Sequence, residues 1–291
     1  MATVYWTGAV STDPTVGGNW STAVVPAVNE DVVFPATATV NCIGGDLSGV
    51  AVNSVTIQEG CSIDLGTSTA VPLAFDVGGA ATNVVNDYGS GTKYLTCNNA
   101  AQWNVYAGAT MEIDGVDNTE LNINASGATI VIGPTYGAAN NAEFDKIGFI
   151  KAGTVTLRNI LQSDDATALD INGIFGGTVH SEIPLRNVYQ YGGALYQEEG
   201  AVAAYYGEGG KLNYASAGTI ALLVIGPGGE VDFNSDFRAR TVTEADLNAG
   251  ATLTDTYRTV TWTNPIEFHR CSIVDCTIDL GANREYTAAN L

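Results

Sequence analysis

Positively charged side chains are scarce in this 291-residue chain, which has 11 Lys and Arg residues against 31 Asp and Glu and a formal net charge of −20. Binding to a nucleic-acid backbone needs clustered Lys and Arg, and the closest basic pair here is Arg238 and Arg240. We therefore expect neither nucleic acid nor an anionic membrane as a partner. The charge is typical of a solvated, self-repelling surface, and attraction to a basic partner surface or to cations is the alternative.

Histidine is nearly absent, since His180 and His269 are the only two. No Ser/His/Asp or Cys/His arrangement is expected from two isolated histidines, and no histidine-based metal motif. The five cysteines are odd in number and irregularly spaced, which excludes a disulfide framework. Cys271 and Cys276 lack the CxxC spacing, so we expect reduced thiols, as in a reducing cytoplasm. The sequence thus predicts no catalytic residue, no metal site and no cofactor.

Acidic residues offer the remaining candidate chemistry. Asp114, Asp117 and Glu120 could surround a calcium ion, although Asp is also an ordinary turn residue. The adjacent pairs Asp164–Asp165 and Glu198–Glu199 could act in glycoside cleavage only at a separation of about 5 to 9 Å, which the sequence does not establish. Ordinary turn chemistry is the interpretation we favour for all of them.

Long apolar runs and helical patterns are also missing. The longest apolar run, residues 220–225, is too short to span a bilayer, and the first residues have no basic region followed by an apolar stretch. We therefore expect synthesis in a cytoplasm without a secretory address. With four lysines, two methionines and no long 3.6-residue period, the chain is predicted to be nearly all β.

What the chain has in abundance is a repeated phrase, a glycine and a small residue followed by alternating apolar positions. Examples begin at Gly60, Gly108, Gly127, Gly153, Gly177, Gly218 and Gly250. Glycine supplies the turn, and period-two alternation predicts a strand with one buried face. The intervals from 108 to 127, 153 and 177 are 19, 26 and 24 residues, a scale typical of stacked repeats. A parallel β-helix (solenoid) over residues 41–291 follows, with a two-domain β-sandwich as the alternative.

Two segments depart from this pattern. Residues 1–40 contain Trp6, Trp20 and several prolines, and we interpret them as an N-terminal cap on the open end of the stack, or an attachment segment that docks on another protein. Residues 189–214 form a tyrosine-rich interruption, predicted to be a projecting loop or a looser pair of coils. Tyrosine suits protein contact or sugar stacking, and local packing is the alternative. The candidate attachment residues are Trp6, Trp20, Tyr191, Tyr196, Tyr205 and Tyr206.

The opening of the chain carries a resemblance. Tyr5-Trp6-Thr7-Gly8, then residues 18–22 (GNWST), Pro26 and residues 31–34 (DVVF) resemble the start of β-solenoid proteins among bacteriophage virion components and bacterial surface proteins. The resemblance covers about 35 residues, and the glycine repeat extends it over most of the chain. It implies a right-handed parallel β-helix and carries no catalytic residues.

The resemblance and the composition together give the expected function, a non-enzymatic structural protein that decorates or cements the exterior of a phage capsid. The acidic charge suits an outer location, and the expected partners are the major capsid protein or another virion protein and further copies of the chain, for instance in a trimer. Two alternatives stay open. One is a tail fibre or tailspike component that binds a host surface glycan, and the other is a polysaccharide-active β-helix enzyme.

Overall fold

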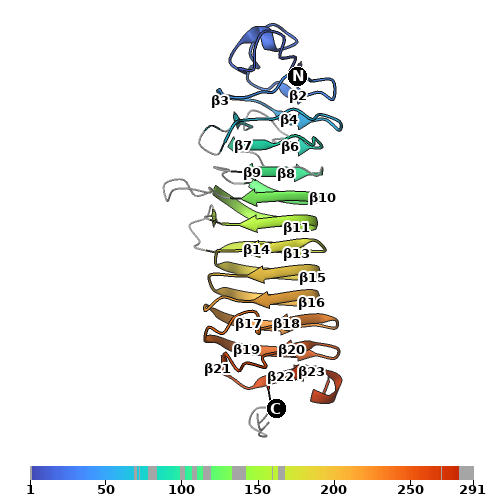
Figure 1. Cartoon of the computed structure of the whole chain (residues 1–291), viewed down its shortest axis with the longest axis vertical. Coiled ribbons are helices and arrows are strands. Elements are labelled where there is room, and N and C mark those ends of the chain that lie inside the picture. The colour runs from blue at the N-terminus through green and yellow to red at the C-terminus, as the bar shows by residue number, and fades with distance from the viewer. Residues whose placement is uncertain are drawn as a thin grey trace. The chain divides into compact units, whose positions relative to one another are not determined.

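The computed structural model describes residues 2–68, 71, 73–77, 84–98, 102–106, 110–113, 119–132, 142–158, 160–162, 168–269 and 271–281. Over these residues the fold is all-β, as the sequence predicts, with 23 strands, two short 3-10 segments and no α-helix. The chain divides into two units, residues 1–148 with 152–166, and residues 149–151 with 167–291. Figure 1 shows strands stacked in parallel layers within each unit.

The first unit contains the following elements: β1 (Thr3–Tyr5), η1 (Gly17–Asn19), β2 (Asp31–Phe34), β3 (Asp46–Ala51), β4 (Ser54–Ile57), β5 (Leu73–Asp76), β6 (Val84–Asp87), β7 (Lys93–Asn98), β8 (Gln102–Val105), β9 (Thr110–Ile113), β10 (Thr119–Ile132) and β12 (Ile160–Gln162). β11 (Ala142–Leu157) contributes residues to both units. Two rows of parallel pairs run through the first unit. One joins β1, β2, β4, β6, β8 and β10, and the other joins β3, β5, β7, β9 and β10.

Parallel register in the first row puts like side chains above one another. Val4, Val32, Val55, Val85, Trp103 and Leu121 align from strand to strand and are all nearly fully buried. Asn86, Asn104 and Asn122 form a second column, joined by amide hydrogen bonds of 3.0 and 3.1 Å between residues 18 apart. Each strand therefore buries its apolar face against the strands before and after it in the row.

The first forty residues enclose a small aromatic core. The rings of Trp6 and Trp20 meet edge to face at 5.1 Å, and both contact Phe34. Their indole N–H groups donate to Val40 O and Pro14 O at 2.9 and 2.8 Å, so both buried rings are satisfied. β1 and β2 of this segment also belong to the first row, and the stack therefore begins before residue 40.

The second unit contains these elements: β13 (Leu169–Ile174), β14 (Thr178–Ser181), β15 (Leu185–Gln197), β16 (Val202–Tyr214), β17 (Thr219–Ile225), β18 (Gly229–Asp232), β19 (Arg240–Asn248), β20 (Thr252–Thr254), β21 (Val260–Trp262), β22 (Ile266–His269), η2 (Ile273–Asp275) and β23 (Thr277–Asp279). Its strands also pair in parallel. One column of aligned side chains comprises Val179, Leu195, Leu212, Val231, Leu253 and Ile278. A second column comprises Leu169, Leu185, Val202, Ile220 and Val242.

The glycine of the repeated phrase lies at a corner of the chain. Gly177, Gly193 and Gly210 have φ of 76°, 67° and 77°, the left-handed region that favours glycine. A Cβ on Gly193 would lie 2.6 Å from Gly177 O, and one on Gly210 would lie 2.6 Å from Gly193 O. At Gly193 and Gly210 the corners therefore stack too closely for any side chain. In the repeated phrase itself, positive φ at Gly60, Gly153, Gly177 and Gly250 accounts for the choice of glycine.

Of the two predictions for residues 189–214, a projecting loop or a looser pair of coils, the projecting loop is wrong. The segment lies within β15 and β16, two 13-residue strands that pair in parallel from Leu185–Val202 to Gln197–Tyr214. The loop interpretation failed because the Gly-Gly pairs resemble a loop in sequence, whereas each bends a continuous strand at a corner. Buried Gln190 supports this corner, since its Nε2 lies within 3.2 Å of the carbonyls of Gly192, Gly193 and Lys211.

Candidate functional site

An aromatic surface, formed by outward side chains of the second unit, is the strongest candidate for a binding site. We define it as Phe175, His180, Tyr189, Tyr191, Tyr196 and Tyr206. Phe175, Tyr189, Tyr191 and Tyr206 precede the corner glycines of their turns, whereas His180 and Tyr196 follow them. The rings stack in three nearly parallel pairs, with centroid distances of 5.0 Å for Phe175–Tyr191, 4.9 Å for His180–Tyr196 and 4.8 Å for Tyr189–Tyr206. Such pairs present flat apolar faces with hydroxyl groups at their edges.

Strand geometry explains why these rings gather. Tyr189 and Tyr191 flank buried Gln190, so alternation along β15 sends both rings outward. Parallel register then sets Tyr189 beside Tyr206, and His180 beside Tyr196. The distance between neighbouring strands, about 4.8 Å, matches the observed ring separations. The stacking is therefore a direct result of register.

The predicted attachment tyrosines fall into two groups. Tyr191 and Tyr196 are 48% and 37% exposed, and Tyr206 is half-buried beside Tyr189, so these three lie on the aromatic surface. Tyr205 points inward, is fully buried, and donates its hydroxyl hydrogen to Gln190 Oε1 at 2.8 Å. Burial raises the pKa of the Tyr205 hydroxyl far above its ordinary value. The prediction of Tyr205 as a contact residue is wrong. Adjacent residues on a strand face opposite sides, so Tyr205 points inward while Tyr206 points outward.

Trp6 and Trp20 are also wrongly predicted as contact residues. They are only 1% and 2% exposed, and their N–H groups are already bonded within the fold. A partner would have to unfold the aromatic core around Phe34 to reach either ring. Both tryptophans therefore contribute to packing of the N-terminal segment rather than to direct attachment.

Titratable groups border the aromatic surface on its β14 side. His180 Nδ1 lies 2.8 Å from Glu198 Oε1, while its ring stacks on Tyr196. Both partners are partly exposed. The surface thus combines apolar rings with a polar His180–Glu198 contact, a combination suited to recognition.

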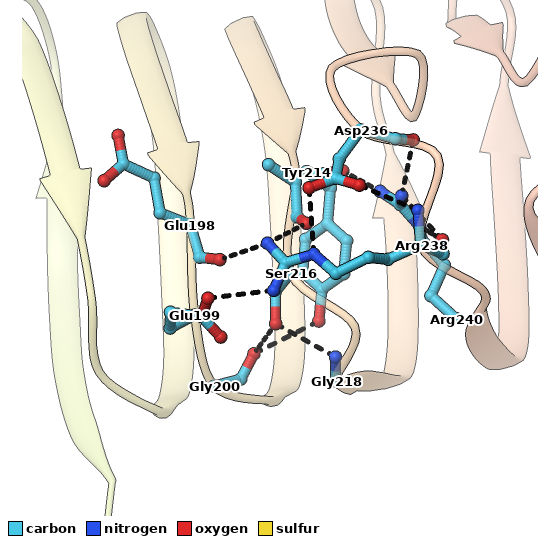
Figure 2. A network of polar contacts seen from close by, with 10 residues as sticks. Glu198, Glu199, Gly200, Tyr214, Ser216, Gly218, Asp236, Arg238 and Arg240 are labelled. Atoms are coloured by element: carbon cyan, nitrogen blue, oxygen red, sulfur yellow. Dashed lines mark hydrogen bonds and ion pairs between the residues drawn. The ribbon is translucent and has the colours of Figure 1, made fainter.

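A polar network next to the ends of β15 and β16 holds successive turns together (Figure 2). Arg238 Nη2 donates to the carbonyls of Glu198 and Ala215 at 3.1 and 2.7 Å, and its Nη1 bonds to the carboxylate of Glu199 at 2.8 Å. Asp236 accepts from Arg238 Nε at 2.8 Å. Glu198 and Glu199 are therefore engaged with His180 and Arg238 respectively, which does not favour their use as a paired acid and base on a glycoside.

Arg240 extends this network into the interior. Only 3% of the residue is exposed, and its guanidinium donates to the carbonyls of Tyr214, Asp236 and Arg238. It also lies 5.9 and 6.0 Å from the ring centres of Tyr214 and Phe233. Burial lowers the pKa of Arg240 from its ordinary value. Because backbone carbonyls occupy these donors, Arg240 is suited to structural support.

A group of possible metal ligands escaped the sequence analysis. His269 Nε2 lies 3.4 Å from Asp246 Oδ1 and 3.8 Å from Glu267 Oε2. The three residues line a cavity of about 330 Å³ and could hold a divalent cation, although exposed acidic groups commonly gather beside a histidine without one. The pairing of Asp246 with Glu267 in parallel strands unites residues that are distant in sequence. The sequence alone does not indicate this group, because the pairing register of β19 and β22 brings its members together.

The structure leaves most of the other candidate acids untested. Asp114, Asp117, Asp164 and Asp165 lie outside the described residues. Glu120 forms an ion pair with Lys146 at 3.2 Å.

Comparisons with known proteins identify no relative. No family model, curated protein or solved structure matches the chain. Among the residues that the structure describes, no helix is both long and apolar enough to cross a membrane.

Proposed function

We propose that this chain is a right-handed parallel β-helix that serves as a non-enzymatic structural protein on the exterior of a bacteriophage capsid. Support for the β-helix comes from parallel strand rows, aligned apolar columns and stacked corner glycines in the described residues. Support for the phage assignment comes from the opening segment around Trp6 and Trp20, which resembles that of phage β-solenoids. The strongly acidic composition suits an outer location, where encapsidated DNA would not repel the chain.

The observation that carries the proposal is the aromatic surface, because it is both exposed and fixed in place. Tyr191 and Tyr196 project from β15, whose buried neighbours Gln190 and Leu195 hold the backbone. A preorganised aromatic surface binds with little loss of side-chain entropy. Many identical copies on a capsid would also strengthen weak individual contacts through multivalency. We assign attachment to the major capsid protein, or another virion protein, to this surface.

Particle composition tests the proposal. Purified phage particles should contain the protein, and imaging should place it at regular positions on the head. Absence from the particle refutes the virion assignment, and density at the tail alone favours the tail-fibre alternative.

Variants test the contact surface separately. The double variant Tyr191→Ala/Tyr196→Ala should reduce particle occupancy at least tenfold, since removal of two aromatic anchors that the capsid contact would bury costs more than about 1.4 kcal/mol. Tyr257→Ala is the matched control, because Tyr257 is 52% exposed and lies outside the aromatic surface. Equal occupancy of the two variants, both folded by circular dichroism, would refute the assigned surface while leaving the virion role intact.

Glycan binding on a tail fibre or tailspike is the second candidate. The stacked pairs Phe175–Tyr191 and Tyr189–Tyr206 favour it, since sugar rings pack on flat aromatic faces. Calorimetric titration of the protein with purified host surface polysaccharide tests this candidate. Heat of binding that disappears in Tyr191→Ala supports it, and release of new reducing ends in the same mixture would instead support a polysaccharide-active enzyme.

A further inference from the structure

Two thiols lie together at the C-terminal side of the second unit. Cys271 follows β22 and Cys276 precedes β23, with the 3-10 segment η2 between them. Both are free and only partly buried. Cys271 Sγ donates to Leu247 O and Cys276 Sγ to Asn248 O, each at 3.3 Å. Burial, together with the neighbouring Cys271 thiol, raises the pKa of Cys276 above its ordinary value. The carbonyls of two consecutive residues at the end of β19 thus hold the two thiols as neighbours.

The backbone between the cysteines is folded into the required turn. Ser272 and Asp275 form a reciprocal cap, with Ser272 N donating to Asp275 Oδ2 at 2.8 Å and Asp275 N donating to Ser272 O at 3.0 Å. Cys276 N donates to Ile273 O at 3.3 Å, which brings the chain back toward Cys271. Gly250 N also donates to Asp275 O at 2.8 Å and anchors this turn to the preceding layer. Backbone hydrogen bonds of this turn therefore hold the Cys271 and Cys276 side chains on the same side of the turn as the end of β19.

The remaining cysteines with described side chains do not share this arrangement. Cys42 and Cys61 are 0% and 1% exposed, and the strand-bridge partner of Cys42 is Leu65 rather than Cys61. Cys42 and Cys61 are therefore not register partners, although 19 residues, about one repeat, separate them. Burial raises the pKa of Cys42 well above its ordinary value, which makes it unreactive. Of these four cysteines, only Cys271 and Cys276 bond to neighbouring carbonyls and also have access to solvent.

We propose that Cys271 and Cys276 form a redox-active dithiol that closes to an intramolecular disulfide by exchange with a small-molecule disulfide such as oxidised glutathione. One thiolate attacks the glutathione disulfide, forms a mixed disulfide and releases one reduced glutathione. The second thiolate then displaces the other glutathione. In total the two cysteines lose two protons and two electrons, and oxidised glutathione becomes two reduced molecules. The product links the end of β22 to the start of β23.

This chemistry is independent of the proposed phage role. A reducing cytoplasm holds such a pair as thiols, whereas an oxidising exterior favours the disulfide. The pair would therefore lock the last turn of the described chain when the protein leaves a cell.

Mass spectrometry of the full-length protein tests the proposal. Reduced protein, freed of reductant, is incubated with oxidised glutathione, quenched with an alkylating agent and digested with trypsin. Cys271 and Cys276 fall in one tryptic peptide, residues 271–284, because Arg270 and Arg284 flank it. We expect this peptide to lose the mass of two hydrogens and both alkylation sites, and to regain them on reduction.

Single variants establish the mechanism. Cys271→Ser and Cys276→Ser should each stop at a glutathione adduct on the remaining cysteine, whereas Cys42→Ala should still form the internal disulfide. Two outcomes overturn the proposal. One is peptide 271–284 with both thiols still alkylated, and the other is a wild-type peptide that carries two glutathiones.

Discussion

A buried ion pair in the first unit allows the sharpest test of the energetics. Asp87 occupies an inward position in a column where its aligned neighbours are Ile57 and Val105. Lys93 Nζ lies 3.3 Å from Asp87 Oδ1 and donates to Gly89 O at 2.7 Å, and both side chains are 1% exposed. A carboxylate in such a column is stable only with a paired cation. We predict that Lys93→Met, which keeps the chain length and removes the charge, is strongly destabilising.

The expected magnitude follows from the carboxylate left behind. Removal of one partner of a buried pair costs about 3–5 kcal/mol, but Asp87 can limit this cost by taking up a proton. With an ordinary pKa of about 3.9, protonation of an aspartate costs about 4 kcal/mol at pH 7 and about 1.5 kcal/mol at pH 5. Burial already raises the pKa of Asp87 in the wild type. An acid whose pKa is higher in the folded than in the unfolded state destabilises the fold as pH rises. The loss of unfolding free energy caused by Lys93→Met should therefore be smaller at pH 5 than at pH 7.

Urea unfolding measures this loss. Trp6, Trp20 and Trp103 all lie buried in the first unit, so tryptophan fluorescence reports its unfolding. The control is Lys93→Met/Asp87→Ile, which restores an apolar column between Ile57 and Val105 and should recover most of the stability. A loss below about 1 kcal/mol at pH 7, or an equal loss at both pH values, would refute the assigned role of the pair.

Three further predictions concern the remaining packing. Trp20→Ala should cost about 3–5 kcal/mol in urea unfolding, whereas Tyr191→Ala should stay within about 0.5 kcal/mol; equal losses would contradict the burial assigned to Trp20. Arg240→Met should cost about 1–3 kcal/mol through unpaired buried carbonyls, and a stability gain on thermal melting would show that this network is dispensable. Burial raises the pKa of Tyr214 to about 12. The free energy of unfolding should therefore fall as pH rises from the ordinary tyrosine pKa of about 10 toward 12. Absorbance at alkaline pH, compared with Tyr214→Phe, measures this ionisation, and its completion near pH 10 would contradict the prediction.

The local pattern in the sequence was sufficient to predict an all-β fold and its turns. Alternation identifies strands such as β4 (Ser54–Ile57) and β18 (Gly229–Asp232), and corner glycines such as Gly177 and Gly250 have the positive φ that turns require. These features depend only on neighbours in the chain. They are therefore readable without knowledge of the register.

Features that depend on register were missed. Tyr205 and Tyr206 are adjacent and identical in type, yet one lies inside the core and the other on the surface. The burial of Trp6 depends on Trp20 and Phe34, which come from other segments. The cluster of Asp246, Glu267 and His269 exists only because β19 and β22 pair in one register. Composition and local pattern do not indicate which residues of different strands are aligned. The sequence therefore could not show which of the candidate side chains are exposed.

The arginine network also bears on how the second unit resists a pulling force. Strands that contact only their neighbours can peel from a free end one layer at a time. Arg238 bonds to backbone carbonyls at Glu198 and Ala215, residues 40 and 23 positions before it, and to its own loop at Asp236. Detachment of any one of these turns must break bonds shared with the other two. We expect a force–extension trace to show one large rupture here, with a step spanning several layers instead of a sawtooth of single ones.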